Sequence, residues 1–238
     1  MATITETALA ATLDHAILKP ELTRAQVDAE LDIAAQWRVF SVCVRPSDVA
    51  HAAQRLAGTG VAVGTVIGFP HGTTSTAGKV AEAAQALADG ATEFDMVVNI
   101  GALRSGFDEV VTADIRAVVQ ATGLHITKVI LETALLNEEE IVRGSTLAEV
   151  GGADFVKTST GFAGGGATTA HVRLMRGSVG PRMQVKASGG VRSYADALQM
   201  LAAGATRLGT SASGIILAEA RRGDQGGAAL GAVDNASY

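Results

Sequence analysis

Residues 149–156, EVGGADFV, join the end of a helical segment to a short apolar strand. Two similar joints occur elsewhere in the chain, ADGATEFD at 88–95 and LAAGATRLG at 201–209. In each, a glycine stands where it can form the left-handed cap of a helix, and a strand begins two or three residues later. The recurrence of this joint indicates that helices and strands alternate along the chain as repeated units.

Eight strand-like runs alternate with Ala-rich helical segments over the 238 residues. The runs are DHAIL, FSVCVR, VAVGTVIGF, EFDMVVNI, ITKVILET, DFVKTS, QVKAS and TRLGTS, and the helical segments include 23–37, 75–88, 108–121, 138–150 and 194–203. Eight such units predict an α/β fold, a single-domain (β/α)8 TIM barrel over residues 1–222 with a flexible C-terminal tail at 223–238. A doubly wound open sheet is the alternative, but it usually has fewer strands and a Gly-rich first loop.

The composition narrows the class of protein. Hydrophobic residues make up 47% of the chain and aromatic residues only 4%, so the core must consist mainly of Ala, Val, Leu and Ile. A net charge of −5 argues against nucleic acid or an anionic membrane as a partner, since both need a basic surface. A single cysteine excludes an intrachain disulfide, and neither a signal peptide nor a membrane span is evident. We therefore expect a cytoplasmic protein.

Strand parity predicts which side chains point into the barrel. Side chains alternate between the two faces of a strand, so Asp95 lies opposite Phe94 and Met96. The apolar face should pack against the helices, which leaves the polar face inside the barrel. The residues expected there are Ser41, Cys43, Arg45, Asp95, Lys128, Glu132, Lys186 and Ser188. Because barrel interiors are usually filled with branched apolar side chains, this convergence of charges indicates a site.

Lys157 and Lys186 stand late in neighbouring strands, at the barrel end where catalytic residues lie. Either lysine alone is most simply a solvated strand end, but two on the inward parity are harder to explain that way. A nearby cation and partial desolvation both lower the pKa of a lysine, and a neutral amine attacks carbonyls to form a Schiff base. Asp95 could orient the lysines or relay protons, or it could serve as a buried ion-pair partner of Lys128 or Lys186.

Glycine-rich loops follow the last two strands. In TIM barrels these loops commonly bind phosphate, and the backbone N–H groups of Gly189, Gly190, Gly209 and Ser211 could serve as donors here. The five histidines show no metal-ligand spacing, and no GxGxxG or Walker motif is present. We therefore expect chemistry without a metal or other cofactor, and we expect Cys43 to be a small buried side chain near the pocket.

The motifs EFDMVVNIG, KVILET, FVKTSTGF, GGAT, VKASGGVR and GTSA occur in this order, and together they resemble the deoxyribose-phosphate aldolase family. The resemblance runs from about residue 13 to 219. It implies a TIM barrel and a metal-independent class I aldolase that reversibly cleaves 2-deoxy-D-ribose 5-phosphate into D-glyceraldehyde 3-phosphate and acetaldehyde. It also implies that the partners are a phosphorylated sugar and acetaldehyde, and we expect a homo-oligomer, with a dimer favoured.

The resemblance implies roles for individual residues. By motif position, Lys157 is the Schiff-base lysine, Lys186 the second lysine and Asp95 the proton-shuttling aspartate. The substrate-binding set is Asp14, Cys43, Lys128, Thr158, Gly189, Gly190, Gly209 and Ser211. Some members carry a lysine directly after TSTG, where this chain has Phe162, so phosphate must rely on backbone amides here. Two alternatives stay open: a Schiff-base aldolase with a different acceptor, and a catalytically silent barrel that binds a phosphorylated ligand.

After Glu219 the chain continues as ARRGDQGGAALGAVDNASY, a Gly- and Ala-rich tail without helical period that ends in Tyr238. Such a tail is most simply disordered. A flexible segment of this length could also fold back to the mouth of the barrel, where the Tyr238 phenol could relay a proton to an enamine carbon.

We predict that Tyr238→Phe slows the exchange of acetaldehyde methyl protons with solvent, because the variant lacks the phenolic proton. Schiff-base formation at Lys157 should stay nearly unchanged, and deletion of the last few residues should have the same effect as Tyr238→Phe. Proton NMR of acetaldehyde in deuterated buffer measures this exchange. If both variants exchange protons at the wild-type rate, the tail takes no part in catalysis.

Overall fold

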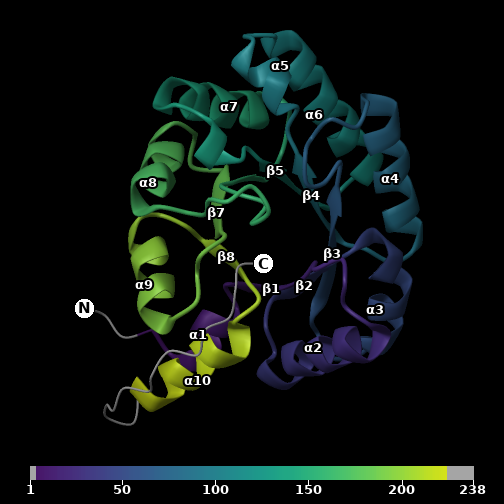
Figure 1. Ribbon diagram of the computed structural model, residues 1–238, viewed down its shortest axis with the longest axis vertical. Helices are drawn as coiled ribbons and strands as arrows, with labels where there is room; N and C mark the ends of the chain where they lie inside the picture. Colours follow the sequence, from purple (N-terminus) through teal and green to yellow (C-terminus); the bar gives the residue numbers. More distant parts are fainter. Residues whose placement is uncertain (1–3, 224–238) are drawn as a thin grey trace.

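Eight parallel strands close into a barrel in the computed structural model, which describes residues 4–223 (Figure 1). Each strand pairs with the next one along the chain, and β1 pairs with β8 to complete the ring. The strands are β1 (Leu13–Ile17), β2 (Ser41–Val44), β3 (Ala62–Ile67), β4 (Glu93–Val97), β5 (Ile126–Ile130), β6 (Phe155–Lys157), β7 (Gln184–Ser188) and β8 (Arg207–Thr210). This topology confirms the predicted TIM barrel and rules out an open sheet. The tail beyond residue 223, with Tyr238, lies outside the described residues.

Helices surround the ring of strands (Figure 1). They are α1 (Glu6–Ala10), α2 (Arg24–Trp37), α3 (Val49–Arg55), α4 (Thr76–Ala88), α5 (Ile100–Arg104), α6 (Asp108–Thr122), α7 (Glu138–Val150), α8 (Thr169–Gly177), α9 (Tyr194–Ala202) and α10 (Ser213–Gly223), with 3-10 turns η1 (Pro46–Asp48) and η2 (Thr133–Leu135). Thr23 and Ser75, which we expected inside helices, are instead the N-caps of α2 and α4, with side chains that accept main-chain N–H bonds. Within residues 4–223, no helix has both the length and the apolar character to cross a membrane.

The apolar side chains divide between the two faces of the barrel wall. Phe94, Met96, Val129 and Val185 belong to the large core between the strands and the helices. A much smaller cluster inside one side of the barrel contains Ala16, Leu18, Cys43 and Val66, with Phe69 packed against it. Within the strands the predicted parity is therefore confirmed, and buried Cys43 has the apolar surroundings that we expected.

Two polar residues that we expected on the inward face of a strand lie beyond the end of that strand. β2 ends at Val44, and Arg45 instead donates to the carbonyl groups of the loop after β1 and pairs with Asp48 at 2.6 Å. β5 ends at Ile130, and Glu132 has a left-handed backbone with φ 59°. Its carboxylate accepts hydrogen bonds from both the N–H and the Oγ1 of Thr160 in the loop after β6. The alternation of a strand does not extend past its last residue, so parity was the wrong guide at both positions.

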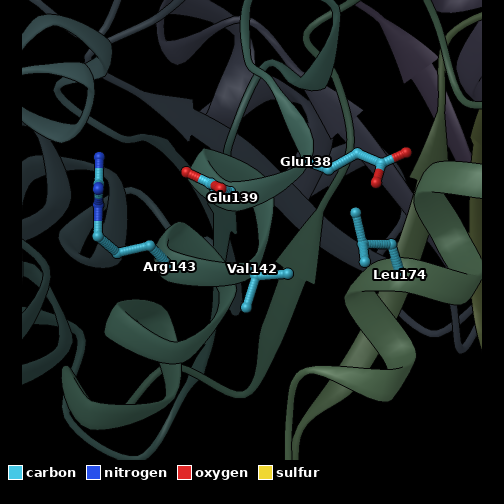
Figure 2. Close-up of a pocket in the computed structure, with 5 residues that line it drawn as sticks. All are labelled: Glu138, Glu139, Val142, Arg143 and Leu174. Atoms are coloured by element: carbon cyan, nitrogen blue, oxygen red, sulfur yellow. The ribbon is translucent and has the colours of Figure 1, made fainter.

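An open groove of about 420 Å³ lies on the outer surface between α7 and α8. Figure 2 shows the side chains that line it, which are Glu138, Glu139, Val142 and Arg143 of α7 and Leu174 of α8. None of these residues was predicted to take part in the chemistry. The charged residues predicted for the site instead converge inside the barrel.

A buried ion pair supports β4 from outside the barrel. Lys79 of α4 is fully buried and pairs with Asp114 of α6 at 2.5 Å, and Thr76 donates to the other oxygen of that carboxylate. The Lys79 Nζ also donates to the carbonyl of Val97, the last residue of β4, at 2.9 Å. The pair thus joins two outer helices to the strand that carries Asp95.

We predict that Lys79→Met lowers the free energy of unfolding by about 3–5 kcal/mol, because the substitution leaves the Asp114 carboxylate buried without its cation. Urea unfolding followed by circular dichroism measures this loss. The double variant Lys79→Met/Asp114→Leu has no buried charge at this position and should recover much of the stability. A single variant as stable as the wild type would contradict the prediction.

Candidate active site

Seven ionisable side chains meet inside the barrel, and each is at most 5% exposed. They are Asp14 of β1, Glu93 and Asp95 of β4, Lys128 of β5, Lys157 of β6, Lys186 of β7 and Arg207 of β8. We call this set the barrel ion network. Burial of so many charges costs several kcal/mol per ion unless they pair closely, so their geometry shows how the site is held together.

Asp95 is the centre of the network. Its Oδ2 accepts from Lys157 Nζ at 2.8 Å and from Lys186 Nζ at 2.7 Å, and its Oδ1 accepts from Lys128 Nζ at 2.8 Å. The strand register explains this convergence, because Asp95 pairs with Lys128 across β4 and β5, and Lys157 pairs with Lys186 across β6 and β7. The structure therefore brings together the two lysines and the aspartate that the sequence singled out.

Asp14 and Glu93 complete the pairing below Asp95. Asp14 lies 2.5 Å from Lys186 Nζ and 2.6 Å from Arg207 Nη1, and it accepts a hydrogen bond from Ser41. Glu93 pairs with Lys128 at 2.6 Å and with Arg207 at 3.3 Å. Each of the three carboxylates therefore contacts at least two cations.

The pKa of Lys157 lies below the ordinary lysine value. Burial is the largest cause, and the neighbouring Lys186 ammonium adds to it, while Asp95 acts in the opposite direction. This agrees with the prediction that desolvation and a second cation favour the neutral amine. Lys157 therefore has more amine character than an exposed lysine at the same pH.

The other two lysines on Asp95 behave differently. Burial acts to lower their pKa values, but Asp14 and Asp95 outweigh it at Lys186, and Asp95, Asp14 and Glu93 outweigh it at Lys128, so both values are raised. The same cations hold the pKa of Asp95 well below its usual range despite its burial. The shared carboxylate thus keeps two lysines charged and leaves Lys157 as the amine that loses its proton first.

The charges of the network balance when Lys157 is neutral. Among residues 4–223, the ion pairs of the barrel interior join three other cations, Lys128, Lys186 and Arg207, to the three carboxylates. An ammonium at Lys157 adds a fourth positive charge that no further carboxylate of the network matches. This balance gives an independent reason why deprotonation is easiest at Lys157.

The remaining predicted residues lie inside the barrel wall and at its rim. Cys43 is buried, which with the nearby Asp95 raises the pKa of its thiol to about 11. The Thr158 hydroxyl donates to the carbonyl of Ser188 and accepts from its N–H, which fixes the end of β6 against β7. In residues 4–223, no group of three or more His, Cys, Asp and Glu side chains is placed to hold a metal ion.

The glycines of the rim differ in their surroundings. Gly189 and Gly190 have φ values of 82° and 80°, a left-handed conformation that side chains rarely adopt. Gly190 is exposed, and so is Ser211, two residues before α10 begins. Gly209 lies inside β8 rather than after it, and a Cβ there would come within 2.3 Å of Ser188 Oγ and 3.1 Å of Lys186 Cε. Gly209 therefore makes room for the Lys186 side chain.

Glu93 and Arg207 belong to the network but were not among the residues predicted from the sequence. Both carried the same signal that identified the other charges, because Glu93 has the parity of Asp95 on β4 and Arg207 has the parity of Gly209 on β8. They lie at the beginning of their strands, whereas the catalytic residues of TIM barrels lie at the strand ends. They contact other members of the network and not Lys157.

A TIM barrel whose interior holds a buried amine beside a carboxylate has the fold and the nucleophile of a Schiff-base aldolase. The family model described as DeoC/LacD family aldolase matches residues 8–230. The chain belongs to this family, which confirms the resemblance seen in the sequence motifs.

Individual relatives support the same assignment. The chain is 56% identical over 200 residues to a deoxyribose-phosphate aldolase of Staphylococcus haemolyticus, across 84% of this chain and 91% of that one. It is 55% identical, with the same coverage, to deoxyribose-phosphate aldolase 2 of Staphylococcus aureus strain MRSA252. Among solved structures, a tetrameric deoxyribose phosphate aldolase from Aeropyrum pernix matches with a TM-score of 0.83 at 30% identity, over 90% of this chain and 91% of that one.

We predict that Lys186→Leu raises the pKa of Lys157, because the variant lacks a neighbouring positive charge and leaves Asp95 with one lysine fewer. The pH at which Lys157 becomes reactive should therefore move upward, and activity at neutral pH should fall. The pH dependence of adduct formation between Lys157 and acetaldehyde, trapped by borohydride, measures this shift. A pH profile that stays at its wild-type position would show that the two lysines are not coupled.

Proposed function

We propose that this chain reversibly cleaves 2-deoxy-D-ribose 5-phosphate into D-glyceraldehyde 3-phosphate and acetaldehyde through a Schiff base on Lys157. The observation that carries the proposal is the shared Asp95 oxygen, which contacts both Lys157 and Lys186 while only the first of these has a lowered pKa. One lysine is thus available as a nucleophile and the other as a charged proton donor. The deoxyribose-phosphate aldolases with more than half of their aligned residues in common give the substrate class.

The first stage forms the iminium ion. The neutral amine of Lys157 attacks C1 of the open-chain aldehyde, and the resulting carbinolamine loses its hydroxyl group as water. We assign the proton for this departure to Lys186, whose Nζ lies 2.7 Å from the Asp95 oxygen that Lys157 also contacts. The Asp95 carboxylate then stabilises the positive iminium nitrogen, as it stabilised the ammonium before.

The second stage breaks the bond between C2 and C3. Loss of the proton from the C3 hydroxyl creates the carbonyl of glyceraldehyde 3-phosphate, and the electrons of the C2–C3 bond move into the iminium to give an enamine. We assign the proton transfers to Asp95 acting with Lys186 and a water molecule. Protonation of the enamine carbon and hydrolysis of the imine release acetaldehyde and return Lys157 to its free amine.

The phosphate should lie at the rim, on the loops after β7 and β8. Gly189 and Gly190 have no Cβ to keep an anion away from the backbone, and Ser211 stands just before the N-terminus of α10. Phe162 is the residue after TSTG and packs edge-on against Phe69, with ring centroids 5.3 Å apart. Backbone amides and the helix dipole therefore take the place of a lysine in binding the phosphate.

We further propose that the enzyme acts in the cytoplasm as a homo-oligomer with a dimer as its basic unit. The composition and the charge of −5 suit a protein whose partners are small molecules rather than nucleic acid. The tetrameric relative from Aeropyrum pernix supports an assembly of identical subunits.

The deciding experiment is reductive trapping combined with a cleavage assay. Acetaldehyde and borohydride should leave an ethyl group on Lys157, located by mass spectrometry of the digested protein. Lys157→Ala and Lys157→Arg should both lower kcat for cleavage by roughly three orders of magnitude or more, since neither side chain forms an imine. The arginine variant keeps a long polar side chain at this position and so controls for the volume lost in Lys157→Ala. An ethyl group on Lys186 instead, or cleavage by folded Lys157→Ala at the wild-type rate, would refute the assignment.

A further inference from the structure

The floor of the barrel is closed by Arg207. Its guanidinium carbon lies 3.5 Å from the centre of the Phe40 ring and 5.4 Å from the centre of the Phe155 ring. Only 5% of Arg207 is exposed. An arginine so fully desolvated interacts strongly with the charges around it, since little water is present to screen them.

Two chains of ion pairs lead from Arg207 to the nucleophile. One passes from Arg207 to Asp14 at 2.6 Å, from Asp14 to Lys186 at 2.5 Å, and through Asp95 to Lys157. The other passes from Arg207 to Glu93 at 3.3 Å, from Glu93 to Lys128 at 2.6 Å, and again to Asp95. Both chains therefore end on the carboxylate that Lys157 shares.

We propose that Arg207 and Glu93 are positioning residues that set the proton affinity of the Lys157 amine from the floor of the barrel. The proposal deepens the proposed function and rests on Lys157 being the Schiff-base lysine. Neither residue contacts Lys157, and both act through the lysines that compete with it for Asp95.

The groups that face Lys157 make this competition explicit. Asp95 from β4 stabilises its ammonium, Lys186 from β7 opposes it, and the Cys43 thiol lies opposite on β2. The more closely Lys186 and Lys128 pair with Asp95, the less this carboxylate stabilises the ammonium form of Lys157. Arg207 and Glu93 control how closely these two lysines pair with Asp95.

Loss of Arg207 should strengthen the hold of Asp95 on Lys157. Without the guanidinium, the Asp14 carboxylate keeps Lys186 at 2.5 Å as its nearest cation, with Lys128 at 3.9 Å, and draws both away from Asp95. Loss of the positive charge itself acts in the same direction, because it makes the interior less positive. Both effects favour the ammonium form of Lys157.

Loss of the Glu93 charge should have the opposite effect. Lys128 is shared between Glu93 at 2.6 Å and Asp95 at 2.8 Å, so a neutral residue 93 leaves Asp95 as its nearest carboxylate, with Asp14 farther away at 3.9 Å. The interior also loses a negative charge. Both effects favour the neutral amine of Lys157.

The test compares the pH midpoint for ethylation of Lys157 by acetaldehyde and cyanoborohydride in the full chain. Arg207→Met should raise the midpoint by roughly 0.5–1 pH unit and Glu93→Gln should lower it by a similar amount, the size expected for charges separated by several ångströms of protein. The double variant should return close to the wild-type midpoint. Arg207→Lys keeps the positive charge, so its midpoint should also stay close to that of the wild type. Arg55→Met makes the same chemical change outside the barrel, in a pair with Asp32, and should leave the midpoint unchanged.

The possible results separate the two proposals. Opposite shifts that cancel in the double variant support the inference, since a purely structural role does not reverse sign. Equal midpoints in all variants, or a shift in Arg55→Met as large as that in Arg207→Met, would overturn it while leaving Lys157 as the nucleophile. Absence of any ethyl group on wild-type Lys157 would refute the proposed function and the inference with it. Glu93→Gln has nearly the shape of the native residue, so it keeps the test decisive if Arg207→Met does not fold.

Discussion

Three lysines donate to one buried carboxylate, and the rest of this barrel depends on that interaction. Asp95 cannot satisfy Lys128, Lys157 and Lys186 with a single negative charge, so two further carboxylates are needed, Asp14 from β1 and Glu93 from β4 itself. Strand register then fixes which lysine receives which additional partner. Lys157 has Asp95 as its one carboxylate, and burial acts on it with the least compensation. The reactivity of the amine is therefore a result of how the anions are shared.

Such a network is a poor means of stabilising a fold. Buried ion pairs often stabilise a fold no more than apolar side chains of similar volume do. Removal of one partner leaves the other charge unpaired in a medium of low dielectric constant. Most TIM barrels fill the same space with branched apolar residues. Here most of the apolar burial that stabilises the fold lies between the outer face of the barrel and the helices. The apolar cluster inside the barrel, formed by Ala16, Leu18, Cys43 and Val66, is small. The outer core thus stabilises a barrel whose interior is occupied mainly by the ion network.

The alternation of helices and strands and the period of two within strands are local properties, so the sequence predicted them well. The barrel, the outward face of β4 and the convergence of Asp95, Lys128 and Lys186 all follow from them. Strand ends depend on tertiary contacts, which is why parity failed at Arg45 and Glu132, each one or two residues past the last strand position. Thr158 shows another limit, since its hydroxyl bonds to Ser188 of a strand distant in sequence. The floor residues Glu93 and Arg207 carry the inward parity, but they begin their strands, at the end of the barrel opposite to the one where catalytic residues were expected.

Volume constrains the interior as strictly as charge does. Four long cationic side chains have to fit where an ordinary barrel carries shorter branched ones, and two inward positions are glycines. A Cβ on Gly209 would lie 3.1 Å from Lys186 Cε, and one on Gly64 would lie 3.3 Å from Glu93 Cβ. The missing side chains on β3 and β8 therefore leave space for members of the network on β7 and β4. A protein interior is packed too densely to accept long charged groups without such a reduction elsewhere. The glycines inside the barrel are thus as much a part of the amine's environment as the carboxylates that contact it.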